Sequence, residues 1–239
     1  MSEIVTRVPY SMNISSHRES SICSNYCFKI KDPGSSITHF IGFAASIMGT
    51  PLLLIRASLN GTSMTELVSL TVFMMSMILL YGASTAYHTF NISEKVNRKL
   101  RKIDHMMIFL LIAGTYTPVC TLAIDGTGLL LLVYAIAIVG VLVKAFWITC
   151  PKWFSSMIYI GMGWVCILAF PQLIAQLSTG AFLWLLIGGI IYTIGGVIYA
   201  LKLPLFNSIH KNFGSHEIFH LFVMGGSFCH YMCIYLYLS

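Results

Sequence analysis

The chain has 239 residues, of which 57% are hydrophobic and 9% are charged, and its mean hydropathy is +0.82. This composition lies far outside the range of soluble domains, so it excludes a water-soluble fold and indicates an integral membrane protein. The net charge of +6 does not indicate nucleic-acid binding, because the basic residues are distributed over several loops and form no single patch.

The apolar segments predict how many helices cross the membrane. One crossing takes about 20 mostly apolar residues, and the stretches without charge are 33–55, 67–93, 105–124, 126–143, 153–201 and 218–239. The stretch 153–201 is long enough for two helices and is divided by Gln172, Gln176 and the polar run 178–180. The segments are apolar all round, which favours helices over a β-barrel. The predicted fold is therefore an all-α bundle of seven transmembrane helices.

Turn residues and charges set the predicted boundaries along the chain. A tail of residues 1–31, with no apolar run long enough for a signal peptide, precedes a transmembrane domain of residues 32–239. The helices are predicted after 32–35 to about 56, then at about 66–90, 102–124, 126–149, 154–177 and 180–201, and from about 215 onward. Pro51, Pro118 and Pro171 fall inside these segments, where a proline removes a hydrogen-bond donor and can kink the helix.

The orientation follows from the distribution of lysine and arginine. If the amino terminus is cytoplasmic, every lysine and arginine except Arg56 falls on the cytoplasmic side of the seven helices. Short cytoplasmic loops carry an excess of these residues in membrane proteins. The sequence therefore predicts a multi-pass protein of the plasma (inner) membrane, with a cytoplasmic amino terminus and an external carboxyl terminus.

A few ionisable side chains lie at the ends of the predicted helices, where such groups are costly and therefore informative. Ser84 and His88 are four residues apart and share one face of the second helix. His216 and His220 repeat this spacing in the seventh helix, which lets one helix present two imidazoles to a metal ion. Asp104 begins the third helix. Because the helices alternate in direction, all these residues lie near the cytoplasmic face, and we expect an intramembrane zinc site with His88, His216 and His220 as ligands.

The chemistry of this site follows from its ligands. Three neutral imidazoles with an open fourth position are typical of catalytic zinc, whose fourth ligand is usually water. The metal lowers the pKa of that water from about 15.7 to roughly 7. We expect Asp104 to act on the water as a general base or to hold it in place, and Ser84 to donate a hydrogen bond to the water or to a developing oxyanion. Capping of the third helix by Asp104 is the alternative.

The remaining histidines have simpler interpretations. His39, His105 and His230 are interpreted as interfacial or hydrogen-bonded residues, and His17 and His210 as solvated ones.

Residues 216–220 also match H-E-x-x-H, the zinc-protease motif in which the glutamate is the general base. The extended motif fails, because Val223 stands in place of its glycine and Gly226 in place of its third histidine. Glu217 lies beside the face of the two histidines, so capping of the seventh helix is its competing role. An intramembrane protease is thus a minor alternative.

The same motifs resemble the hemolysin III family, the bacterial branch of the progestin and adiponectin receptor superfamily. The matching strings are YGASTAYH (81–88), IDH (103–105), AGTYTP (113–118) and GSHEIFH (214–220), and the resemblance runs from about Asp32 to the carboxyl terminus. It implies seven helices with the amino terminus inside, zinc held by His88, His216 and His220, and Asp104 and Ser84 in support. Eukaryotic relatives are linked to ceramide-like amide hydrolysis and to receptor signalling, whereas bacterial members are named after haemolysis.

These observations support three hypotheses for the function. The leading one is a zinc-dependent hydrolase acting on an amide or ester of a membrane lipid, which would make membrane lipids its partners. A cytolytic pore is the second, and the absence of charged lumen faces gives it little support. The third is a membrane sensor or receptor in which the zinc is purely structural.

Overall fold

The computed structural model describes residues 29–201 and 214–239, and this part of the chain is all-helical, without strands. Most of the predicted tail, including His17, and the loop that contains His210 lie outside the described residues. Seven segments are long and apolar enough to span a membrane. They are α2 (Pro33–Leu59), α3 (Met64–Thr89), α4 (Glu94–Pro118) with η1 (Val119–Ala123), α5 (Thr127–Phe146), α6 (Lys152–Gly163) with η2 (Trp164–Ala169) and α7 (Phe170–Gln176), α8 (Thr179–Leu201) and α9 (Ser215–Tyr237). The prediction of seven transmembrane helices is confirmed.

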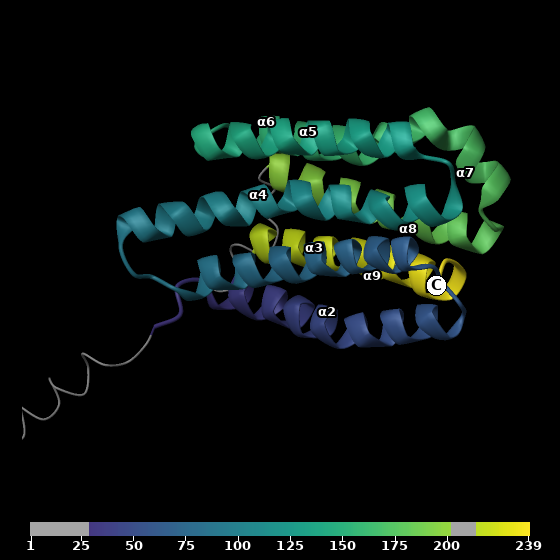
Figure 1. Cartoon of the computed structure of the whole chain (residues 1–239). Coiled ribbons are helices and arrows are strands. Elements are labelled where there is room, and N and C mark those ends of the chain that lie inside the picture. Colours follow the sequence, from purple (N-terminus) through teal and green to yellow (C-terminus); the bar gives the residue numbers. More distant parts are fainter. Residues whose placement is uncertain (1–28, 202–213) are drawn as a thin grey trace, which may run out of the picture.

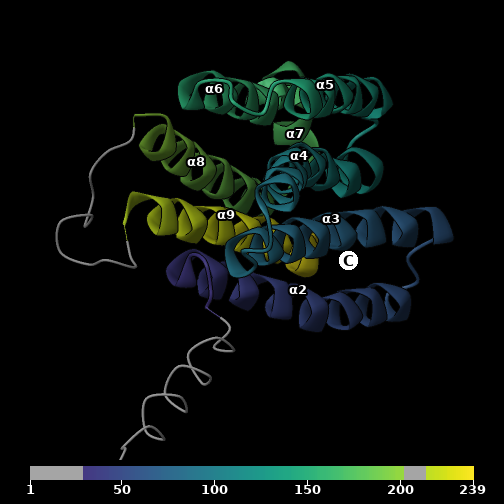
Figure 2. The ribbon, with the colours of Figure 1, turned by 90° about the vertical axis from the view of Figure 1, so that its left-hand side faces the viewer.

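The helices lie roughly antiparallel, side by side along one axis (Figure 1). Helices that follow one another along the chain pack together, and α9 closes the bundle by packing against both α8 and α2 (Figure 2). This closure brings the first and last helices of the described chain into contact. As a result, the start of α2, the end of α3, the start of α4 and the start of α9 share one end of the bundle, where the site is expected.

The start of α4 differs from the prediction. The side chain of Ser93 accepts a hydrogen bond from the N–H of Val96 at 3.3 Å, and α4 begins at Glu94, not near 102. The charged stretch 95–102 is therefore helical although it is polar, because a helix can continue beyond the apolar layer. Asp104 consequently lies in the third turn of α4, and the alternative that it caps this helix is wrong.

The predicted fifth helix is not continuous either. It divides into α6, the 3₁₀ segment η2 and the short α7, with Pro171 in the first turn of α7. At the break, the hydroxyl of Tyr116 on α4 donates to the carbonyls of Met162 and Gly163 at 3.1 and 2.6 Å and accepts from the N–H of Cys166 at 2.9 Å. A side chain inserted into the hydrogen-bond ladder is a recognised cause of a helix break. It also satisfies polar backbone groups that would otherwise lack partners.

Candidate metal centre

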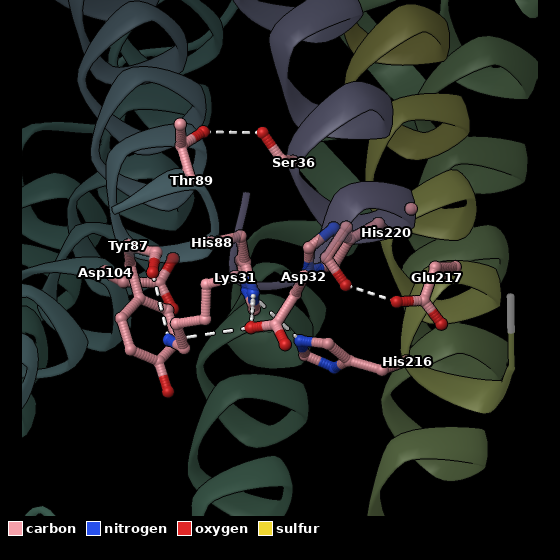
Figure 3. A network of polar contacts seen from close by, with 12 residues as sticks. Lys31, Asp32, Ser36, Tyr87, His88, Thr89, Asp104, His216, Glu217 and His220 are labelled. Atoms are coloured by element: carbon pink, nitrogen blue, oxygen red, sulfur yellow. Dashed lines mark hydrogen bonds and ion pairs between the residues drawn. The ribbon is translucent and has the colours of Figure 1, made fainter. Parts of the chain in front are cut away.

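Three histidines from two helices meet at one end of the bundle. His88 is in the last turn of α3, and His216 and His220 are in the first two turns of α9. One ligand atom from each ring can be chosen so that all three lie within 4.8 Å of one another. The Nε2 atoms of His88 and His216 are 3.3 Å apart, and a dashed line joins them in Figure 3. The structure thus brings together the three residues that the sequence analysis selected.

The orientation of two of these rings is set by side chains from the start of α2. The Nδ1 atom of His88 is 3.0 Å from a carboxylate oxygen of Asp32, and Nδ1 of His220 is 3.2 Å from the hydroxyl of Thr38. In both rings the contact occupies Nδ1 and leaves Nε2 for another partner. A carboxylate or hydroxyl on the second nitrogen is the usual way in which proteins orient a metal-binding imidazole.

A lysine holds Asp32 in this position from the outside. The amine of Lys31 is 3.5 Å from a carboxylate oxygen of Asp32, donates to the carbonyl of Tyr87 at 3.0 Å and lies 3.4 Å above the Tyr87 ring. Backbone hydrogen bonds from Lys31 and Asp32 to the end of α3 fix the same segment. The roles of Asp32 and Thr38 were not predicted from the sequence, in which the start of the first helix was interpreted only as a boundary.

His39 is a further residue that the sequence analysis misinterpreted. Its ring lies 3.5 Å from the ring of His220, with only 8° between the planes, and its side chain is buried. Neither ring nitrogen has a hydrogen-bond partner among the described residues, so the expectation of an interfacial or hydrogen-bonded residue is wrong for His39. For His105 it holds, because its Nδ1 contacts the carbonyl of Arg101 at 2.9 Å and the carboxylate of Asp104 at 3.3 Å.

Asp104 and Ser84 are both buried, and both line the same cavity as His216 and His220. The carboxylate of Asp104 is paired with His105 at 3.3 Å, and the Ser84 hydroxyl oxygen has no hydrogen-bond partner in the described structure. An unpartnered buried hydroxyl costs stability, so its presence beside a cavity indicates a place where a ligand can bind. The roles predicted for the two residues stay predictions.

Glu217 has partners that keep it out of this group. One carboxylate oxygen accepts a hydrogen bond from the N–H of Gly214 at 2.8 Å, which caps α9, and the other accepts one from the hydroxyl of Ser35 on α2. The interpretation of Glu217 as a cap is confirmed. Because both oxygens are engaged in joining α2 to α9, the carboxylate lacks the freedom that the base of a zinc protease needs.

A cavity of about 200 Å³ begins at His216 and His220 and continues into the bundle between α4, α6, α8 and α9. Its polar end includes Ser84, Asp104 and His220. Its far end includes Ile124, which follows η1, and Leu129, near the start of α5. Between them the walls are mainly apolar. The cavity therefore has one polar end, and the rest of it is mainly apolar.

The donor set fits zinc. With Zn–N bonds of 2.0–2.1 Å and tetrahedral angles, two ligating nitrogens lie about 3.3 to 3.4 Å apart. The two Nε2 atoms of His88 and His216 stand at 3.3 Å, and the ligands are imidazoles, which zinc prefers to carboxylates or carbonyls. Two of the three candidate ligands, His216 and His220, also line the cavity.

Comparison with known proteins shows which family the chain resembles. The family profile described as Haemolysin-III related matches residues 28–231. The Hemolysin-3 homolog of Bacillus subtilis is 37% identical over 214 residues, which are 88% of this chain and 96% of the relative. Hemolysin-3 of Bacillus cereus is 37% identical over 213 residues, covering 88% and 93%. The adiponectin receptor protein of Drosophila melanogaster is 26% identical over 228 residues, covering 87% of this chain and 51% of the relative.

Proposed function

We propose that this chain, which belongs to the haemolysin-III-related family, is a zinc-dependent hydrolase that cleaves an amide or an ester of a membrane lipid. The observation that carries the proposal is the group of three histidine nitrogens at one end of a largely apolar cavity. A membrane lipid supplies both a carbonyl group and an acyl chain. The polar end of the cavity suits the first, and the apolar walls suit the second.

His88, His216 and His220 would hold the zinc ion, and Asp32 and Thr38 would keep two of the rings in place. A zinc ion in such a site supplies a Lewis acid that polarises a carbonyl group and lowers the pKa of water toward 7.

Asp104 and Ser84 have complementary parts in the proposed hydrolysis. The Asp104 carboxylate takes a proton from the attacking water and returns it to the leaving nitrogen or oxygen, so that the products are a fatty acid and an amine or alcohol. The Ser84 hydroxyl donates a hydrogen bond to the carbonyl oxygen of the substrate. This hydrogen bond stabilises the negative charge that develops on that oxygen in the transition state. Burial of both groups supports these roles, because electrostatic interactions are stronger where water is excluded.

The proposal includes an orientation and a compartment. We place the protein in the plasma (inner) membrane, with its amino terminus and the histidine cluster on the cytoplasmic side and its carboxyl terminus outside. Of the lysines and arginines in the described ranges, Arg56 alone lies at the end of the bundle away from the cluster, which supports this orientation. The substrate would then enter from the cytoplasmic leaflet.

A zinc ion with a purely structural role is the second candidate. The three histidines come from α3 and α9, and the side chains that orient two of them come from the start of α2. A bound ion would therefore stabilise the packing of these helices, which favours a structural role. Such a site would serve a sensor or receptor that consumes no substrate. A cytolytic pore has less support, because the cavity walls are mainly apolar and offer an ion few polar groups.

The test uses the purified wild-type protein, the His216→Ala variant and the lipid-facing control Met48→Ala, all in detergent. Each is analysed for zinc and incubated with a panel of lipid amides and esters, and the released fatty acid is quantified. The proposal expects release by the wild type and the control and none by His216→Ala. Equal release by His216→Ala would overturn it, and stoichiometric zinc with no substrate consumed would assign the ion a structural role.

A further inference from the structure

The far half of the cavity contains a polar side chain that the proposed hydrolysis does not use. His230 of α9 lines the same cavity as His216 and His220. It follows His220 by ten positions, and at about 1.5 Å per helical residue it lies about 15 Å farther into the bundle. A histidine at this depth is costly, so its presence in the wall of an apolar channel calls for a partner.

The polar neighbours of His230 are already engaged. Besides His230, the side chains with nitrogen or oxygen atoms that line this half of the cavity each make a hydrogen bond within the described protein. They are Thr115, Tyr116, Trp164, Tyr192 and Thr193. No hydrogen bond to either ring nitrogen of His230 is found in residues 29–201 and 214–239.

The ring of His230 is nevertheless held in a defined position. It stacks on the Tyr192 ring, with centroids 5.4 Å apart and 21° between the planes. Tyr192 is itself fixed by a hydrogen bond of 2.7 Å to Ser227 of α9. Gly188, one turn before Tyr192 on α8, approaches so closely that an added Cβ would lie 3.0 Å from Nε2 of His230. These contacts orient the imidazole without satisfying its hydrogen-bonding groups.

We propose that His230 is a binding subsite for a hydrogen-bonding group, such as a hydroxyl, in the middle of an acyl chain. A neutral imidazole offers one donor and one acceptor, and a hydroxyl group complements both. An acyl chain without a polar group would leave the hydrogen-bonding groups of the His230 ring without a partner, and this lowers the affinity for such a chain. The inference rests on the proposed function for the position of the chain, with its carbonyl group at the histidine cluster and its tail in the cavity.

The depth of His230 then predicts where the polar group lies. A C–C bond of about 1.5 Å advances an extended chain by roughly 1.3 Å, so 15 Å corresponds to about 12 carbons. The subsite therefore selects acyl chains with a hydroxyl near the twelfth carbon and ignores a hydroxyl beside the carbonyl group.

The test compares three fatty acids of equal length: stearic, 12-hydroxystearic and 2-hydroxystearic acid. Their binding to the zinc-loaded protein is measured by displacement of a fluorescent fatty acid, for the wild type, His230→Phe and His230→Gln. The wild type is expected to prefer 12-hydroxystearic over stearic acid on the order of five- to tenfold. Phenylalanine should abolish this preference, and glutamine, which keeps a donor and an acceptor, should retain part of it.

Two results would overturn the inference: a wild type that binds the three acids equally, or a 12-hydroxy preference that survives in His230→Phe. If His230→Phe does not fold, the preference of the wild type for 12-hydroxy over 2-hydroxystearic acid decides. Hydrolysis of the corresponding amides is measured in parallel. A binding preference without hydrolysis would defeat only the proposed function, whereas hydrolysis without regard to the hydroxyl position would defeat only the subsite.

Discussion

The imidazole of His39 lies flat against the imidazole of His220, with ring centroids 3.5 Å apart and 8° between the planes. His220 is also held by Thr38, the neighbour of His39 on α2, so both residues fix one ring of the candidate metal centre. A ring that is immobilised before the metal binds loses less conformational entropy on binding. The start of α2 thus contributes to the site without supplying any of the three predicted ligands.

The first prediction concerns this stacked pair. The change His39→Ala removes the stacking and should weaken zinc binding by roughly three- to tenfold, the range of an aromatic pair. The change His39→Phe keeps a flat ring and should preserve most of the affinity. Titration with a competing zinc chelator measures both. If alanine has no effect, or if phenylalanine is as harmful as alanine, stacking is not what His39 contributes.

The second prediction concerns Asp32. The change Asp32→Asn removes the negative charge beside Nδ1 of His88, which should lower the zinc affinity by about 10- to 100-fold, as is typical for partners of metal ligands. Glu94→Gln is the control, because that acid is exposed at the start of α4 and pairs with Arg98. Zinc dissociation constants for the two variants check the expectation. Similar constants for Asp32→Asn and the wild type would contradict it.

The third prediction concerns the packing of α4 against α5. An added Cβ at Gly140 would collide with the buried ring of Phe109, so Gly140→Ala should destabilise the bundle by about 1–3 kcal/mol. Gly128 lies on the same helix, and an added Cβ there would have no atom of the described chain within 4 Å. Thermal unfolding in detergent should therefore show a lower melting temperature for Gly140→Ala and little change for Gly128→Ala. Equal melting temperatures for the two variants would refute the packing account.

The fourth prediction tests the far end of the cavity. Leu129 lines that end, and Leu129→Trp would shorten the space for an acyl chain. Hydrolysis of long-chain amides should fall by roughly tenfold or more, because apolar pockets discriminate steeply against excess length, while short-chain amides should be unaffected. Leu131→Trp, on the exposed surface of α5, is the control. A loss that is equal for long and short chains would show that the chain does not lie in this cavity.

Hydropathy and motif spacing predicted most of the fold and the core of the site. Charge-free stretches located all seven helices, because burial in lipid forces a long apolar run on each of them. The alternation of helix direction placed His88, His216 and His220 at one depth, and they do meet there. The boundaries were less accurate, since a charge-free stretch marks only the apolar layer, and α4 begins well outside that layer, at Glu94.

What could not be predicted depends on contacts between distant segments. Hydropathy shows that Thr38 and His39 are in a helix, but not which face of α2 turns toward α9. The break in the fifth helix depends on the Tyr116 hydroxyl, which comes from α4 and is distant in the sequence. Asp32 could have been suspected, because it precedes the first helix at the same end of the bundle as His88.

X-ray absorption at the zinc edge tests the metal site most directly. The purified protein should bind one zinc ion, with three imidazole nitrogens and one oxygen at about 2.0–2.1 Å. Each of the variants His88→Ala, His216→Ala and His220→Ala should lose one imidazole from this spectrum or lose the ion. A spectrum with sulfur scattering at about 2.3 Å, or one unchanged in all three variants, would contradict a zinc site formed by these histidines.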